Sequence, residues 1–278
     1  MRSYLLCLLP ILLCTCGPAP ENAEVTTNPA LQVTAENHDA LMADLMPDKG
    51  YTHVKTIGIL VYDGVNELDV FGPRYVLTQD MQSQLQLIAL EPGPVTTVTG
   101  LTFEPNTTID QVDSLDILII PGGFRGTIEA AYDEEVLDWI RKIDQTTTFT
   151  SAICTGGWIL GATGLLEGKR ATTNWYRAEE YMTKYGAEFT HERFTRDGKI
   201  WTAAGVTAGM DMALAMLAEL RGEAYAQGVM LDMEYDPAPP ITGGSPNATP
   251  ASVFQMMQGM YDMGVQPLVD SLEAARKR

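Results

Sequence analysis

The sequence predicts an α/β protein with a mostly parallel sheet and helices on both of its faces. Apolar segments of strand length alternate with segments of helical periodicity along most of the 278 residues. The segment "KTIGILVYDG" is apolar without a break, as in strands that are buried on both sides. The chain is 45% hydrophobic and 19% charged, which is enough for one sizeable core.

The first residues have the pattern of an export signal. Arg2 precedes an apolar run from Tyr4 to Leu13 that is too short to span a bilayer comfortably. The segment "LCTC" ends at Cys16 and resembles a bacterial lipobox, although a plain signal peptide cut nearby is the alternative. We expect residues 1–16 to be a signal peptide and Cys16 to be acylated. The protein would then be exported and lipid-anchored in the bacterial cell envelope, facing the periplasm.

Composition excludes several classes of partner. A net charge of −18 repels phosphate backbones, so nucleic acid is not an expected partner, and the N-terminal lipid is the only expected membrane contact. Three His and four Cys are too few for a closed metal site, and no cofactor is expected. Cys7 and Cys14 lie within the signal and Cys16 at its end, which leaves Cys154 as the one thiol of the folded body.

The elements follow in order along the chain. Residues 17–54 are polar and dotted with proline, and they predict a flexible tether with a short helix in "HDALMADLM". The main domain is predicted to cover residues 55–222. Its first half contains predicted strands at 55–64, 85–91 and 115–123, a helix entered through Asp69 at 69–79, and an amphipathic helix at 133–143.

The second half of the domain continues the alternation. It contains predicted strands at 147–154 and 170–175, helices at 156–166, 177–186 and 207–222, and a hairpin over 187–205 with its Asp-Gly turn at 197–198. Residues 223–278 begin as a Pro/Gly-rich arm and end in a helix from about Ser252 to Arg278. This part is expected to pack on the domain or on a partner subunit.

Cys154 lies where a strand is predicted to turn into a helix, in "FTSAICTGGWIL". A strand, a cysteine, two small residues and a helix form the cysteine counterpart of the nucleophile elbow. The helix N-terminus is expected to lower the pKa of the thiol and favour the thiolate. After another strand, Gly122 and Gly123 leave their backbone N–H groups uncovered for a developing anion. An inert, buried core cysteine is the alternative.

A reactive thiol needs a partner that handles protons. His38, His53 and His191 do not follow a predicted strand directly, but the acids Glu67 and Asp69 do. A carboxyl group pressed against a thiol in a dry pocket has a raised pKa and can carry a proton at neutral pH. The alternative for Asp69 is a helix N-cap, and the spacing does not decide which of the two acids faces the sulfur.

Four segments in order resemble the ThiJ/PfpI superfamily, also called class I glutamine-amidotransferase-like proteins. They are "GILVYDGVNELDVFGP", "DILIIPGGFRG", "SAICTGGWILGATGLLEGKRATTNW" and "GVTAGMDMALAMLAEL". Within that superfamily they look most like the isonitrile hydratase branch and its transcription-regulator relatives. The resemblance covers roughly residues 55–222 and implies a flavodoxin-like three-layer sandwich that is commonly dimeric.

The resemblance also implies roles for particular residues. It implies catalytic roles for Cys154, Asp69 and Thr155 and an oxyanion or substrate-binding role for Gly122, Gly123 and Gly156. Many relatives carry histidine where this chain has Asn174. Amidase, protease and glyoxalase-like activities lose their best base by this change, whereas isonitrile hydration does not need it.

We therefore expect a cysteine-dependent enzyme that converts an isonitrile and water into an N-substituted formamide, a lyase reaction that passes through a thioimidate. Its substrate is a small molecule, and a homodimer is expected. The alternative is a non-catalytic protein of the cell envelope that binds a small molecule or senses redox state, with Cys154 passing through sulfenic acid.

Overall fold

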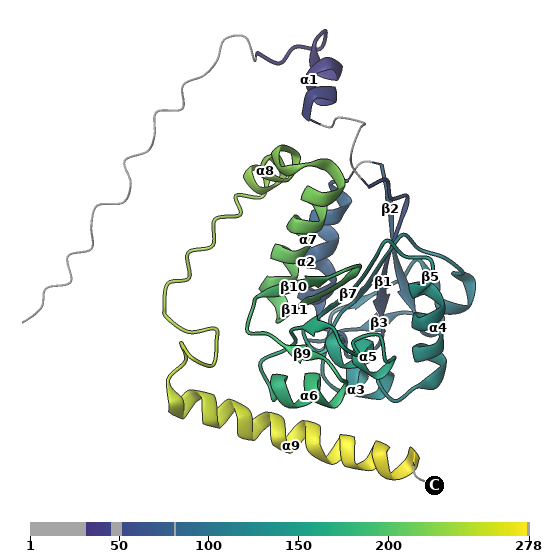
Figure 1. Cartoon of the computed structure of the whole chain (residues 1–278), viewed down its shortest axis with the longest axis vertical. Helices are drawn as coiled ribbons and strands as arrows, with labels where there is room; N and C mark the ends of the chain where they lie inside the picture. The colour runs from purple at the N-terminus through teal and green to yellow at the C-terminus, as the bar shows by residue number, and fades with distance from the viewer. Residues whose placement is uncertain (1–31, 46–51, 81, 277–278) are drawn as a thin grey trace, which may run out of the picture. The chain divides into compact units, whose positions relative to one another are not determined.

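The computed structural model describes residues 32–45, 52–80 and 82–276 (Figure 1). The chain divides between Met42 and Ala43 into two compact units. A short helix, α1 (His38–Leu45), lies where the sequence predicts one. The predicted signal peptide and Cys16 fall outside the described residues. Within the described residues, no helix is both long and apolar enough to cross a membrane.

A seven-stranded sheet forms the centre of the second unit, in the order β10-β11-β7-β6-β1-β2-β5. All neighbouring strands are parallel except the edge pair β10 and β11. The strands are β1 (Thr56–Val61), β2 (Gln84–Ala89), β5 (Thr107–Thr108), β6 (Ile117–Ile120), β7 (Phe149–Ile153), β10 (Phe194–Asp197) and β11 (Ile200–Ala203). The predicted α/β class with a mostly parallel sheet is confirmed.

Helices cover both faces of this sheet (Figure 1). On one face α2 packs against α7, and α7 packs in turn against α8; on the other, α5 contacts both α3 and α4. The helices are α2 (Glu67–Thr78), α3 (Arg125–Ala130), α4 (Glu134–Asp144), α5 (Gly156–Ala162), α6 (Ala178–Lys184), α7 (Val206–Arg221), α8 (Glu223–Asp232) and α9 (Ala251–Arg276). Two small sheets, β3 (Val95–Thr96) with β4 (Thr102–Phe103) and β8 (Arg170–Ala171) with β9 (Glu188–Phe189), complete the unit.

The core fills the space between the sheet and its helices. The side chains of the central strands are almost wholly buried, as the unbroken apolar runs predict. The apolar stripe of α4 is buried too, through Val136, Leu137, Ile140 and Ile143. The glycine-rich loops therefore follow strands that are held rigidly on both sides.

Two local predictions differ from the structure. The helix after β1 begins at Glu67, because the side chain of Asn66 caps it by accepting the N–H of Leu68 at 3.0 Å. Asp69 therefore lies inside the first turn and is not the cap. The predicted strand at 170–175 pairs only through Arg170 and Ala171.

The C-terminal helix α9 packs on its own domain, beside α3 (Figure 1). It buries Val265 and Val269, while residues 234–250 before it form an arm without helix or strand. Packing on a partner subunit, the other position that the sequence leaves open for this helix, stays a prediction.

Candidate active site

The strand order brings the three predicted loops together. β7, β6 and β1 are neighbours, so Cys154, Gly122 and Asp69 meet beyond their carboxyl ends. From β1 the chain continues to β2 in one direction along the strand order, and from β6 it continues to β7 in the opposite direction. Ligands of parallel α/β sheets bind at such a reversal of direction. This edge is the candidate active site.

Cys154 has the backbone of a nucleophile elbow. Its φ angle is +58°, a left-handed value that is uncommon for a residue with a side chain. Its N–H donates to the carbonyl of Ala203 at 2.9 Å, and α5 begins two residues later at Gly156. A Cβ atom at Gly156 would lie 2.1 Å from the carbonyl oxygen of Ile120. The turn fits only because this position lacks a side chain.

Asp69 is the acid that faces the sulfur. It is fully buried, and its Oδ2 accepts the N–H of Gly122 at 3.1 Å. Its Oδ1 has no hydrogen-bond partner in the described part of the chain, and the Cys154 thiol lies close enough to the carboxyl group to affect its pKa. Burial raises the pKa of Asp69 to about 7, although hydrogen bonds from Gly122 and Cys154 oppose that rise. This carboxyl group can both give and take a proton at neutral pH.

Glu67, the other candidate acid, has a different environment. Its carboxylate accepts a hydrogen bond from the Thr99 hydroxyl, which lowers its pKa. The geometry therefore settles which of the two acids pairs with the thiol.

The Cys154 thiol does not have the low pKa that the sequence predicts. Its residue is only 6% exposed, and burial raises the thiol pKa far above its ordinary value. The negative charge of Asp69 raises it further, while the N–H of Thr155 and the side chain of Asn174 lower it. The expected thiolate is therefore wrong for this structure, because the helix N-terminus offsets only part of the desolvation.

Asn174 is a site residue that the sequence analysis missed. Its Nδ2 donates to Cys154 Sγ at 3.3 Å, and its Oδ1 accepts the N–H of Tyr176 at 3.0 Å. The preceding Thr173 donates its hydroxyl to the carbonyl of Cys154 at 2.7 Å. The sequence offered one signal, since Asn174 stands where many relatives carry histidine. That signal indicated only the loss of a general base and not a hydrogen-bond donor to the sulfur.

The Thr155 hydroxyl binds the backbone of a neighbouring loop. It accepts the N–H of Gly123 at 3.0 Å and donates to the Gly123 carbonyl at 2.9 Å. The N–H of Gly122 binds Asp69. Both amides are thus engaged, in contrast to the uncovered N–H groups that we expected. The substrate-binding roles of Gly122, Gly123 and Gly156 stay predictions.

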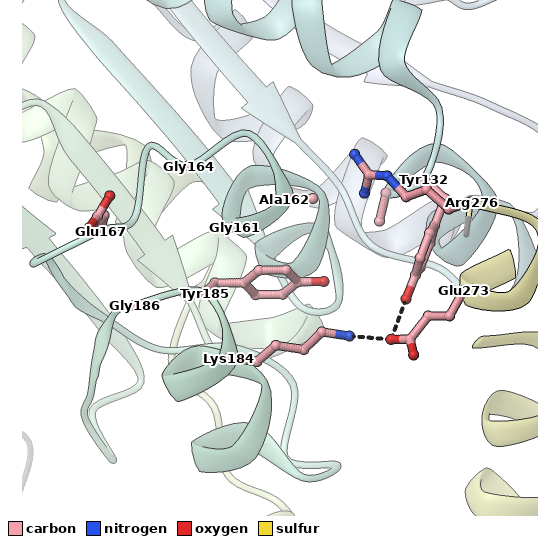
Figure 2. A pocket seen from close by; sticks show the side chains of 11 residues that line it. Tyr132, Gly161, Ala162, Gly164, Glu167, Lys184, Tyr185, Gly186, Glu273 and Arg276 are labelled. Carbon is pink, nitrogen blue, oxygen red and sulfur yellow. Dashed lines mark hydrogen bonds and ion pairs between the residues drawn. The ribbon is translucent and has the colours of Figure 1, made fainter. Parts of the chain in front are cut away.

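No metal site accompanies these residues in the part of the chain that is described: no group of three or more His, Cys, Asp or Glu is placed to hold an ion. A cavity of about 560 Å³ lies elsewhere, between α5, α6 and α9 (Figure 2). Cys154, Asp69 and Asn174 do not line it. Cys154, Asp69 and Asn174 are themselves buried, so the candidate chemistry depends on side chains in a closed site.

A family model described as DJ-1/PfpI matches residues 55–219, more than half of the chain. The chain belongs to the DJ-1/PfpI family. It is 41% identical over 197 residues to an isonitrile hydratase of Pseudomonas putida, covering 71% of this chain and 86% of that protein.

Two further relatives show the range of the family. A ThiJ/PfpI family protein of Pseudomonas syringae has a solved structure with a TM-score of 0.75 and 35% identity, covering 84% of this chain and 98% of that one. The transcriptional regulator CdhR of Pseudomonas aeruginosa is 29% identical over 141 residues, which is 50% of this chain and 41% of the regulator. DJ-1/PfpI membership alone therefore does not fix an activity.

Proposed function

We propose that this DJ-1/PfpI protein hydrates an isonitrile to an N-substituted formamide. The observation that carries the proposal is the buried pair of the Cys154 thiol and the Asp69 carboxyl, with the Asn174 amide on the sulfur where a histidine base would otherwise act. The similarity to the P. putida isonitrile hydratase supports the same reaction.

The first step uses one proton that the pair already holds. With Asp69 as carboxylate and Cys154 as thiol, the sulfur attacks the terminal carbon of R–N≡C while Asp69 removes the thiol proton. Asp69 then delivers that proton to the same carbon. The product is the thioimidate R–N=CH–S–Cys, and Asp69 is a carboxylate again.

The second step adds water to the thioimidate. Asp69 accepts a proton from a water molecule as the water oxygen bonds to the thioimidate carbon, and it passes that proton to the nitrogen, which gives R–NH–CH(OH)–S–Cys. Asp69 then carries the hydroxyl proton to the sulfur as the C–S bond breaks, and R–NH–CHO leaves with Asp69 a carboxylate again. Asn174 stabilises negative charge on the sulfur in both steps, because its Nδ2 donates to Sγ.

The redox-sensing alternative receives less support from this site. Oxidation of a cysteine requires thiolate character and access to the oxidant. Cys154 is almost inaccessible, and its pKa is raised. Both features weigh against a redox sensor, and a covalent reaction at the same thiol requires Asp69 to take its proton during the attack.

The test is turnover of the purified protein on isonitriles, amides and α-oxoaldehydes. Formamide should form only from isonitriles, and Cys154→Ala and Asp69→Asn should each lower kcat by at least about a thousandfold, the size of loss seen when a nucleophile is removed. Glu67→Gln is the matched control, because Glu67 binds Thr99 and should be replaceable. Normal turnover by Cys154→Ala would refute the mechanism.

We also propose that the protein is an exported lipoprotein acylated at Cys16 and that it acts as a homodimer. The lipobox-like segment before Cys16 supports the first statement. Labelling of cells with a fatty-acid probe should mark the protein, and Cys16→Ala should abolish the label. A wild-type protein that stays unlabelled would contradict the anchor.

A further inference from the structure

Helix α9 places an aromatic ring between the two loops that surround the candidate site. The ring of Tyr261 contacts Phe124 at 5.7 Å, Trp175 at 5.0 Å and Tyr176 at 5.0 Å between ring centroids. Phe124 directly follows Gly123, and Trp175 directly follows Asn174. The Tyr261 ring therefore bridges the loop that binds Asp69 and Thr155 and the loop that binds the sulfur.

Polar contacts fix the position of α9 on these loops. Asp262 accepts hydrogen bonds from the Tyr176 hydroxyl at 2.7 Å and from Arg177 Nη2 at 2.8 Å. A Cβ atom at Gly264 would lie 2.5 Å from the Phe124 ring, so that ring rests against bare helix backbone. Asp262 and Gly264 lie on the same turn of α9. Their contacts fix the position of the helix along the two loops.

A second anchor lies nearer the end of the helix. Glu273 accepts hydrogen bonds from Lys184 Nζ at 2.9 Å and from the Tyr132 hydroxyl at 3.1 Å (Figure 2). These side chains line the cavity between α9 and the domain. The seam along α9 is therefore held by polar contacts at Asp262 and Glu273, with Val265 and Val269 buried between them.

The phenol of Tyr261 is within electrostatic reach of the reacting groups. Burial is the main cause that raises its pKa, and Cys154 and Asp69 raise it further when they are ionised. The phenol therefore keeps its proton at neutral pH and is a hydrogen-bond donor. Tyr261 lies outside residues 55–219, which the DJ-1/PfpI model matches.

The site beneath is closed to solvent. Asp69, Thr155 and Cys154 are exposed by 0%, 3% and 6%. A substrate thus reaches the sulfur only if a covering element moves. α9 is suited to move, because the mostly exposed arm 234–250 joins it to the rest of the chain.

We propose that α9 is a lid that closes the site with Tyr261, and that Tyr261 contacts the substrate above Cys154 and Asp69. The second half of this inference rests on the proposed isonitrile hydration. The lid itself does not depend on which substrate is turned over. In the closed state the phenol donates a hydrogen bond to the substrate, and α9 lifts from the Trp175–Arg177 loop to exchange substrate and product.

The lid is tested by alkylation of Cys154 with iodoacetamide, followed by mass spectrometry of the Cys154 peptide in the full-length protein. Asp262→Asn weakens a partly exposed charge-assisted contact and should speed alkylation about 5-fold or more. Tyr261→Ala should speed it at least as much, while Tyr261→Phe should not. Met260→Ala, on the exposed face of α9, is the matched control. Equal rates in all five proteins would overturn the lid.

The substrate contact is tested by steady-state kinetics of Tyr261→Phe on an isonitrile. Loss of one hydrogen bond should lower kcat/KM about 10-fold, without any change in Tm or in alkylation rate. Unchanged kinetics would overturn the contact. If the wild-type protein hydrates no isonitrile, the proposed function and the contact both fail, whereas the alkylation rates still decide the lid.

Discussion

One proton shared by two buried side chains is the central feature at the scale of the residue. Burial raises the pKa of Asp69 to about 7 and raises the pKa of the Cys154 thiol well above that. Environments that separate the pKa values of two titratable groups assign them distinct roles. In the proposed mechanism the thiol holds the proton at rest, and the carboxylate receives it when the sulfur attacks.

The pH dependence of kcat/KM follows from this arrangement. The active form has Asp69 as carboxylate, so activity should be lost as pH falls through about 7. Between pH 8 and 9 the rate should stay level, because Asp69 is then a carboxylate and the raised pKa of Cys154 keeps the thiol protonated. A profile of kcat/KM against pH, measured with an isonitrile, tests both the loss of activity at low pH and the level region above it. An activity that persists to pH 5 would contradict the role of Asp69.

Removal of the amide at the sulfur should slow the reaction without destroying the site. Asn174→Ala deletes the hydrogen bond to Sγ, and kcat should fall about 10-fold, as expected for one such bond. The thiol pKa should rise further, because Asn174 lowers it in the wild-type protein. Pre-steady-state kinetics of thioimidate formation would detect the change, and a wild-type rate would exclude Asn174 from the chemistry.

Residue identities were easier to predict than protonation states. The Cys154 turn and the acidic pair Glu67 and Asp69 followed from their positions after buried strands, and only the family resemblance favoured Asp69 of the two acids. The raised thiol pKa did not, because it depends on how completely helix α9 and the loops exclude water from the sulfur. Asn174 was missed because its amide gains a role only when the fold brings it to Sγ.

At the scale of the element, the elbow depends on close approach between strand end and helix start. Gly156→Ala would place a methyl group 2.1 Å from the Ile120 carbonyl oxygen and should lower the free energy of unfolding by about 2–3 kcal/mol. Gly228→Ala in α8 has open space around it and should stabilise by about 0.5–1 kcal/mol. Chemical denaturation compares the two. Equal stability of both variants would contradict the elbow packing.

Elements with strong periodicity were predicted well, and short pairings were not. The central strands and α4 match their apolar patterns because burial on the sheet dictates those patterns. The start of α2 was misplaced because Asn66 and Asp69 are both good caps by composition, and only the hydrogen bond to Leu68 distinguishes them. Helix α3 is six residues long and leaves little periodic signal.

At the scale of the whole molecule, the strand order determines which loops meet. Local sequence shows that three loops follow strands, but not that β7, β6 and β1 are neighbours. That order comes from long-range pairing. The resemblance to the ThiJ/PfpI superfamily supplied it in advance, and the family membership and the sheet agree with it.

The buried acid should reduce the stability of the folded protein at neutral pH. The pKa of Asp69 in the folded protein, about 7, lies above its ordinary value of 3.8. The contribution of the protonated carboxyl to the free energy of unfolding is therefore fully present below pH 4 and is lost as pH rises through 7. The loss is on the order of 4 kcal/mol at most, at about 1.4 kcal/mol per pKa unit. Asp69→Asn should therefore raise Tm more at pH 8 than at pH 5. A larger gain at pH 5 would contradict the raised pKa.

The protonation state of Cys154 tests the central claim most directly. The thiolate absorbance in the ultraviolet, measured against pH as the difference between the wild-type protein and Cys154→Ser, reports it. We predict no thiolate at pH 7 in the wild-type protein. In Asp69→Asn the thiolate should appear at a lower pH than in the wild-type protein, because the Asp69 charge raises the thiol pKa. A full thiolate signal at pH 7 in the wild-type protein would contradict the shared proton.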